Sequence, residues 1–179
     1  IDLMLEERVL DLPMREADVA IRMKEPSQAD LIRKKLMSIQ MQLYATREYL
    51  EKKGTPTEIS DISDHRLICQ SPGSAQVSAG AEMVQALMSH DPQSLLTVNN
   101  YFGVLQAVLQ NLGIGALPDY LIEDFPDLVR VLPEFESGDV PVFLAYPEEL
   151  RHSKRISTFR DFVQEEIIAH RKQLRQRDT

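Results

Sequence analysis

The stretch VNNYFGVLQAVLQNLGIGALP, residues 98–118, decides the fold of this chain. A short apolar strand at 95–98 ends at Asn99 and Asn100. Either asparagine can cap the helix that follows, because its short side-chain oxygen accepts an otherwise unpaired backbone N–H. Apolar residues then recur at helical spacing, which indicates that one face of the helix is buried. These residues are Val104, Leu105, Val108, Leu109 and Leu112.

The end of this stretch predicts a second strand. Gly113 is expected to supply the left-handed residue that stops the helix, and the apolar run 114–117 is closed by Pro118. The corner between the first strand and the helix is where such strand–helix–strand units bind small ligands, and the N–H groups at the helix start attract anions. The alternative is an ordinary packing unit, since fold does not fix function.

Strands alternate with helices along the rest of the chain, which predicts an α/β fold with a largely parallel sheet. The further predicted strands are 1–5, 17–21, 39–45, 66–70, 128–132 and 140–146. The predicted helices are 47–53, capped by Thr46 and ended by Gly54, then 79–89 with Met83, Ala86 and Leu87 on one face, and 154–173. Residues 30–36 fit either a strand or a turn of helix, and residues 71–73 form a turn.

Composition limits the classes of function. The 179 residues are 43% hydrophobic and 27% charged, enough to bury a core in one domain or two small lobes. An apolar run of ~20 residues is lacking, so we expect no membrane span. The net charge of −8 argues against binding nucleic acid through this piece. Residues 150–179 carry eight Lys and Arg against four Asp and Glu, which favours a solvated helix end.

Catalytic and metal-binding patterns are not found in the sequence. It has no G-x-S-x-G, Walker loop or dinucleotide fingerprint. Cys69 lies in an apolar strand and is expected to be a buried small residue rather than a nucleophile. As a lone cysteine it also fits a reducing, cytoplasmic compartment. The four histidines lack the spacing of metal ligands, so we expect no metal site. They are His65, His90, His152 and His170. With the catalytic and dinucleotide motifs also missing, we expect neither an enzyme nor a cofactor.

Several phrases, taken in order, resemble the effector-binding domain of LysR-type transcriptional regulators. They are ADVAIR, LYATREYLEKKGTPTEISDISDHRLI, the stretch quoted first, and LVRVLPEF followed by VPVFLAYPEELRHSKRISTFRDFV. The resemblance implies two Rossmann-like lobes joined by two crossover strands, as in type 2 periplasmic binding proteins. Lobe I would be 1–42 and 146–179, and lobe II would be 43–145. The family's N-terminal winged helix-turn-helix and the first strand and helix of lobe I are absent from this chain.

The resemblance also implies a ligand site in a cleft between the lobes. Arg22 and Met23 would line it from lobe I, and a guanidinium can hold a carboxylate bidentately. The alternative for Arg22 is a surface ion pair with Glu25 or Asp30. Thr46 offers a hydroxyl to the site or is a plain N-cap. From lobe II, the resemblance implies that the effector would be contacted by the residues at the family's matching positions. In this chain they are Gln70, Ser71, Asn99, Asn100 and Tyr101.

The function that the resemblance implies is the regulatory half of a bacterial transcription factor. It would bind a small anionic or polar effector, and closure of the hinge strands 39–45 and 140–146 would change the geometry of a dimer or tetramer. DNA would be bound by the missing N-terminal domain, and no membrane partner is expected. An exposed edge strand at 1–5 makes side-by-side association of copies plausible. The alternative function is a solute-binding protein of a transport system.

Overall fold

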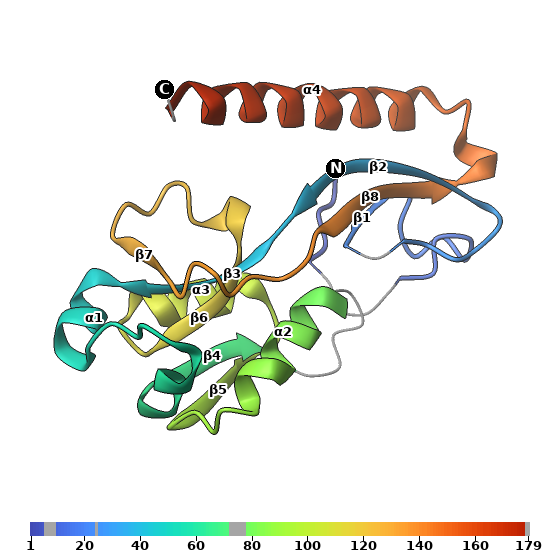
Figure 1. Cartoon of the computed structure of the whole chain (residues 1–179). Helices are drawn as coiled ribbons and strands as arrows, with labels where there is room; N and C mark the ends of the chain where they lie inside the picture. Colours follow the sequence, from blue (N-terminus) through green and yellow to red (C-terminus); the bar gives the residue numbers. More distant parts are fainter. Residues whose placement is uncertain (6–9, 24, 72–77, 178–179) are drawn as a thin grey trace. The chain divides into compact units, whose positions relative to one another are not determined.

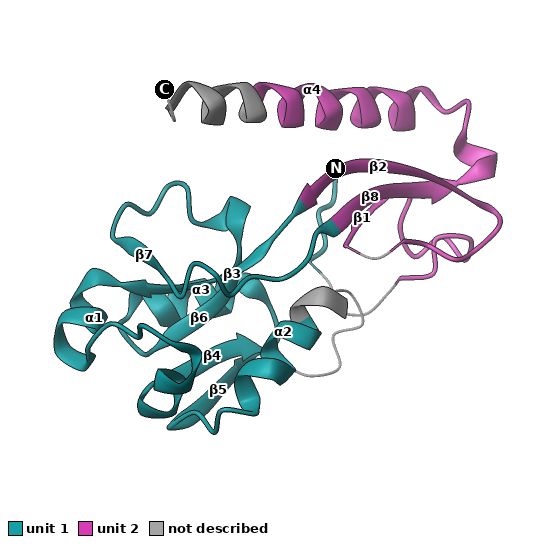
Figure 2. Cartoon of the chain, viewed as in Figure 1, with its two compact units in different colours: residues 1–8, 39–140 teal, residues 9–38, 141–179 magenta. Residues whose placement is uncertain are grey.

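The computed structural model describes residues 1–5, 10–23, 25–71 and 78–177, with side chains left undescribed at 78–80 and 170–177. The chain forms two compact units (Figure 2). Unit 1 comprises 1–8 and 39–140, and unit 2 comprises 9–38 and 141–179. By these bounds, the chain passes from one unit to the other at 8/9, 38/39 and 140/141.

Within the described residues, unit 1 contains a five-stranded sheet in the order β5-β4-β6-β3-β7 (Figure 1). Its strands are β3 (Met41–Thr46), β4 (Arg66–Gln70), β5 (Ser94–Val98), β6 (Ile114–Pro118) and β7 (Leu128–Val131). β4 runs parallel to β5 and β6, but β3 runs antiparallel to both β6 and β7. The fold class is α/β as predicted, but the expectation of a largely parallel sheet is wrong, because the sheet is mixed.

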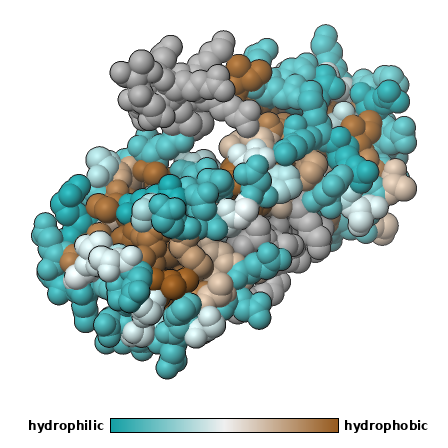
Figure 3. Space-filling model, viewed as in Figure 1, coloured by the Kyte–Doolittle hydropathy of each residue, from teal (hydrophilic) through white to brown (hydrophobic). Residues whose placement is uncertain are grey.

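The core of unit 1 lies between this sheet and α3 (Tyr101–Leu109). Val104, Leu105 and Val108 of the helix are buried and pack with Tyr44, Ile68 and Leu117 of the sheet. The predicted apolar face of the helix is therefore confirmed over its first two turns, whereas Leu112 lies beyond the helix and is 40% exposed. On the visible face of unit 1, hydrophobic residues show in the middle with hydrophilic residues around them (Figure 3).

The other helices of unit 1 begin and end close to their predicted positions. α1 (Arg47–Lys53) is capped by the Thr46 side chain, which accepts from the Tyr49 N–H at 3.2 Å, and it ends at Gly54 with φ 90°. α2 (Ser78–Met88) buries Met83 and Leu87. Ala86 is exposed, so its predicted place on the buried face is wrong. The predicted turn at 71–73 lies mostly outside the described residues. The short helices η1 (Ile59–Asp64) and η2 (Asp119–Leu121) complete the unit.

The turn after α3 differs from its prediction in a way that matters for packing. The residue with positive φ is Asn111, at 59°, and Gly113 does not have one. Gly113 is required for space instead, because a Cβ there would lie 2.4 Å from the carbonyl oxygen of Arg66 on β4. The glycine therefore permits a close approach between two backbones, and the asparagine makes the turn.

The described residues of unit 2 form a three-stranded sheet in the order β1-β8-β2, with strands β1 (Ala20–Arg22), β2 (Leu31–Ile39) and β8 (Val140–Pro147). The ambiguous segment 30–36 is thus a strand, and β1 is shorter than the predicted 17–21. The final helix, α4 (Lys154–Arg177), buries Ile156 against Leu144 and Tyr146 of β8. η3 (Glu148–Leu150) links β8 to α4.

Residues 1–5 are not a strand, so this prediction is wrong, and with it the edge-strand argument for association. Ile1, Leu3 and Leu5 are at least 76% exposed and have no strand partner in the described part of the chain. No helix among the described residues is both long enough and apolar enough to cross a membrane.

Candidate functional site

The carboxyl ends of β4 and β5 form a topological switch point in unit 1. The chain steps from β4 through α2 to β5, and then back across β4 through α3 to β6. Right-handed crossovers in opposite directions place the two helices on opposite faces of the sheet, and Figure 1 shows α2 in front of it and α3 behind it. Open α/β sheets bind ligands at such switch points.

Five of the eight predicted site residues lie together at this edge. Gln70 is paired with Val98 in the parallel register of β4 and β5. Its Nε2 donates to the Asn99 carbonyl oxygen at 3.3 Å, and the Ser71 N–H donates to the Val98 carbonyl oxygen at 2.8 Å. These bonds join the two strand ends. The residues brought together are Gln70, Ser71, Asn99, Asn100 and Tyr101.

The start of α3 is fixed by Asn100 rather than by Asn99. Asn100 Oδ1 accepts the Gly103 N–H at 2.8 Å, and Asn100 Nδ2 donates to Asn99 Oδ1 at 3.2 Å. Asn100 is therefore the N-cap of α3, and Asn99 orients the Asn100 amide. The side chains offer amide and hydroxyl groups beside the partial positive charge of a helix N-terminus, and such an arrangement favours an oxygen-bearing ligand.

Thr46 lies at the opposite edge of the same sheet. Tyr44, Gly115 and Ile68 are at one level of the strands by register. Thr46 is two residues from this level in one direction and Gln70 is two residues from it in the other. At a rise of about 3.3 Å per residue, the two lie about 13 Å apart along the strand direction. Thr46 performs the N-cap role and also bonds to the Asn111 side chain.

Arg22 belongs to unit 2, where it ends β1. It is 6% exposed, and its Nη2 donates to the carbonyl oxygen of Leu10. Burial lowers the pKa of the guanidinium, while the charge of Asp11 acts in the opposite direction. This contact ties the turn before β1 to the strand.

A surface ion pair of Arg22 with Glu25 or Asp30 is not found among the described residues. Glu25 instead pairs with Arg33 at 3.3 Å. Met23 follows Arg22 immediately after β1 and is half-buried. The two unit 2 residues are thus neighbours, and Arg22 uses part of its hydrogen-bonding capacity within its own unit.

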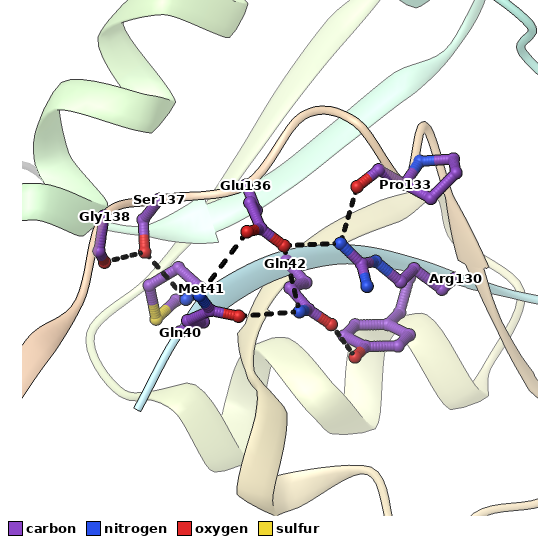
Figure 4. Close-up of polar contacts among 9 residues, drawn as sticks. Gln40, Met41, Gln42, Arg130, Pro133, Glu136, Ser137 and Gly138 are labelled. Atoms are coloured by element: carbon purple, nitrogen blue, oxygen red, sulfur yellow. Dashed lines mark hydrogen bonds and ion pairs between the residues drawn. The ribbon is translucent and has the colours of Figure 1, made fainter. Parts of the chain in front are cut away.

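A polar network that the sequence did not predict lies at the same edge as Gln70 (Figure 4). Gln42 is opposite Leu117 on β6, at the level that Gln70 has on β4. The Gln42 side chain accepts from the Tyr44 hydroxyl at 2.5 Å, and its Nε2 donates to Gln40 at 3.4 Å and to Glu136 at 3.5 Å. Burial raises the pKa of the Tyr44 phenol to about 12, so this hydroxyl stays protonated and can donate.

Glu136 connects this network to the segment that leads into β8. It accepts from Arg130 Nη2 at 2.6 Å and from Gln40 Nε2 at 3.4 Å. Ser137 and Met41 bond reciprocally, with Ser137 N–H to the Met41 carbonyl at 2.9 Å and Met41 N–H to Ser137 Oγ at 2.8 Å. Sequence reasoning missed these residues because 94 to 96 positions separate the bonded pairs, and the signal in the sequence is only the polar Gln-x-Gln in an apolar strand.

Asp119, which follows the last residue of β6, completes this edge. Its N–H donates to the Gln40 carbonyl at 2.9 Å, and its Oδ1 is buried without a hydrogen-bond partner among the described residues. Burial raises the pKa of its carboxyl group, against the bonds from backbone N–H groups that lower it. No cluster of His, Cys, Asp or Glu in the described part of the chain is able to hold a metal ion.

The chain resembles known proteins over most of its length. A family model described as the LysR substrate binding domain matches residues 1–167. An uncharacterized HTH-type transcriptional regulator of Haemophilus influenzae is 23% identical over 155 residues, covering 85% of this chain and 54% of that protein. The HTH-type transcriptional regulator CrgA of Neisseria meningitidis serogroup C is 26% identical over 172 residues, covering 93% and 57%. The chain spans about half the length of the curated relatives it matches.

The chain also resembles solved structures of regulatory domains. The regulatory domain of CrgA, a LysR-type transcriptional regulator from Neisseria meningitidis, has a TM-score of 0.72 at 25% identity, covering 87% of this chain and 78% of that chain. The regulatory domain of an AphB variant from Vibrio vulnificus has a TM-score of 0.62 at 23% identity, covering 88% and 78%. The second likeness shows the fold alone.

Proposed function

This chain belongs to the LysR substrate-binding domain family, and we propose that it senses a small-molecule effector for a transcriptional regulator. The curated relatives described above are transcriptional regulators, which favours this function over solute binding for transport. DNA binding would reside in a part of the protein outside this chain. A regulator of this kind acts where the DNA is, so a cytoplasmic location in a bacterium follows from the proposal, as does assembly into a dimer or tetramer.

The observation that carries the proposal is the convergence of five polar residues at the switch point of unit 1. The carboxyl ends of β4 and β5 bring amide and hydroxyl groups to the start of α3. These five side chains are uncharged. We therefore propose an effector that presents hydroxyl, carbonyl or carboxylate oxygens to amides and backbone N–H groups, rather than one held in unit 1 by a salt bridge.

Arg22 and Met23 are the proposed contribution of unit 2. A guanidinium has five N–H donors, and the contact with Leu10 occupies a part of them. A carboxylate effector would use the rest, whereas an uncharged effector would not need Arg22. Thr46 has its own partners at the other edge of the sheet, so we assign it to the cap of α1 and not to the effector.

An effector of this kind acts on the regulator only if it favours one arrangement of the protein over another. Coupling free energies between two sites are typically about 1–3 kcal/mol, or five- to 150-fold in affinity. The network around Glu136 offers a physical connection, because it joins the edge of the sheet to the segment that enters β8. The account requires no catalytic step, and we propose that the chain is not an enzyme.

A thermal-shift screen of the chain against sugars, amino acids and aliphatic and aromatic carboxylic acids would find an effector. A ligand at 100 times its dissociation constant adds about 2.7 kcal/mol to the free energy of unfolding, which raises the melting temperature visibly. Calorimetry would then compare the wild type with Gln70→Ala and Asn100→Ser. The serine keeps a capping oxygen and removes the amide.

Each variant is expected to weaken binding by about five- to tenfold, because one hydrogen bond contributes about 1–1.5 kcal/mol. Gln106→Ala, at an exposed position of α3, is the matched control and should bind as the wild type does. Wild-type affinity in both Gln70→Ala and Asn100→Ser would contradict the assignment of the effector to this edge.

A further inference from the structure

A second polar feature of unit 1 lies at the opposite edge of its sheet, where β4, β5 and β6 begin. The end of α1, the start of β4, the residue before β5 and the turn after α3 surround a surface hollow of about 230 Å³. The residues that line it are Tyr49, Lys52, Lys53, Arg66, Gln93, Asn111 and Leu112.

The lining is cationic in a chain that is acidic overall. Three of the seven lining residues carry positive charge and none carries negative charge, whereas the net charge of the whole chain is −8. Like charges around one hollow repel one another unless an anion lies between them. Lys52 is already paired, since its Nζ lies 2.5 Å from Glu48 Oε1. Among the described residues, the cations of the hollow without an ion pair are therefore Lys53 and Arg66.

Arg66 is held in place at the start of β4. Its Nε donates to Ser94 Oγ on β5 at 3.0 Å, and this is the one hydrogen bond of the guanidinium among the described residues. Its two NH₂ groups are therefore available to a ligand. Lys53 has no ion pair within the described part of the chain, and its charge acts on the buried His65, whose pKa is lowered mainly by burial.

The floor of the hollow is formed by a buried, hydrogen-bonded side chain. Tyr49 is 5% exposed, and its hydroxyl lies 3.1 Å from Nδ1 of the buried His65. Asn111 forms one wall, with its side chain bonded to both Thr46 and Glu48. The cations are thus mounted on a preformed surface rather than on a loop.

We propose that this hollow binds a small oxyanion, with Arg66 and Lys53 as its main contacts. The guanidinium fork matches two oxygens of a phosphate or carboxylate, and the ammonium group adds a point charge. A volume of about 230 Å³ is below the ~300–1,000 Å³ of pockets for drug-sized ligands, so the ligand is the size of a phosphate or a short dicarboxylate. The site is separate from the effector site at the carboxyl edge.

The neighbouring hollow provides an internal control. It has a volume of about 320 Å³, shares Asn111, and contains Arg47 together with three carboxylates. The full lining is Thr46, Arg47, Glu48, Glu51, Asn111 and Asp127. Since its net charge is negative, it should not attract an anion, and Arg47→Gln changes the charge of the chain by as much as Arg66→Gln does.

The test is a titration of the ¹⁵N-labelled chain with inorganic phosphate, and separately with malonate, at constant ionic strength. Saturable shifts are expected for the backbone amides of Lys53, Arg66 and Asn111. Arg66→Gln and Lys53→Gln should each weaken binding about tenfold, because a hydrogen bond to a charged group contributes about one factor of ten or more. The anion that binds more tightly identifies the class of the ligand.

Arg47→Gln should leave the affinity unchanged. Equal weakening by all three charge variants would overturn the proposal in favour of general electrostatic attraction. Shifts that never saturate with either anion would also overturn it. Effector binding is followed at Gln70, Ser71 and residues 99–101, and binding to this hollow at Lys53, Arg66 and Asn111, so failure of either proposal leaves the other untouched.

Discussion

Replacing Gly103 by alanine tests how closely the start of α3 approaches β5. A Cβ at this position would lie 2.4 Å from Cγ1 of Val98 and 3.4 Å from Oδ1 of Asn100. The first distance is far inside van der Waals contact, so Val98 or the start of the helix must move. Since the Gly103 N–H also donates to Asn100 Oδ1 at 2.8 Å, a shift of the helix would disturb the candidate site.

Two effects of opposite sign decide the stability of this variant. Alanine is favoured over glycine inside a helix by about 1 kcal/mol, and overpacking costs about 1–3 kcal/mol. With a contact as short as 2.4 Å, the overpacking cost exceeds the helical preference. Gly103→Ala should therefore lower the free energy of unfolding by up to about 2 kcal/mol. In a Val98→Ala background the contacting methyl group is gone, so the same change should raise stability by up to about 1 kcal/mol.

Urea unfolding of the wild type, both single variants and the double variant measures these four free energies. The expected result is a reversal of sign, with the glycine substitution destabilising beside Val98 and stabilising beside alanine. Such a cycle isolates the coupling between two residues in contact. If Gly103→Ala had the same effect in both backgrounds, the close approach of α3 to β5 would be refuted.

Four further outcomes follow from the packing and burial of unit 1. Thr46→Ala should lower the free energy of unfolding by about 1–2 kcal/mol through loss of the cap of α1, and Thr46→Ser should restore most of it in the same urea experiment. Gly113→Ala should be more destabilising than Gly103→Ala in thermal unfolding, because its Cβ would meet the backbone carbonyl of Arg66 at 2.4 Å and no side chain can rotate away. Burial raises the pKa of Cys69 to about 12, so the native thiol should not react with a disulfide reagent at mildly alkaline pH and should react once urea unfolds the chain. Burial raises the pKa of the Asp119 carboxyl group above its ordinary value of 3.8. The protonated carboxyl group therefore contributes its full stabilisation at pH values below 3.8, and this contribution is lost as the pH rises through the raised pKa. Asp119→Asn should flatten this part of the stability profile measured by urea titrations across acidic pH.

The sequence predicts most of the local structure of unit 1 because the signals are local. Thr46, Gly54 and Asn100 mark helix ends through their own side chains or backbone freedom, and the structure uses all three for that purpose. The strand 66–70 is found with its predicted bounds. Capping and strand patterning depend on neighbours within a few residues, which a single sequence contains.

The remaining features depend on contacts between distant segments. The sequence predicts that Gly113 ends the helix. The structure requires a glycine there because the backbone of β4 passes close by at Arg66, 47 positions earlier. The sequence leaves Thr46 as either a site residue or a plain N-cap, and the antiparallel direction of β3 carries it to the edge away from Gln70. The apolar residues 1–5 have the pattern of a strand and lack a partner strand among the described residues.

The candidate site shows the same division. Gln70 ends one predicted strand, and Asn99 and Asn100 follow another, so parallel pairing is enough to bring them together. The bonds of Gln42 with Glu136 arise only after the segment before β8 has returned to the sheet, and the length of the intervening chain hides them from pattern analysis.

The most direct test of the effector site is a chemical-shift map of the ¹⁵N-labelled chain with a ligand from the thermal-shift screen. The account predicts that the largest saturable changes occur at Gln70, Ser71 and residues 99–101, where β4 and β5 end and α3 begins. Changes confined to the opposite edge, around Lys53 and Asn111, would contradict it, because the effector would then bind where the sheet begins and not at its switch point.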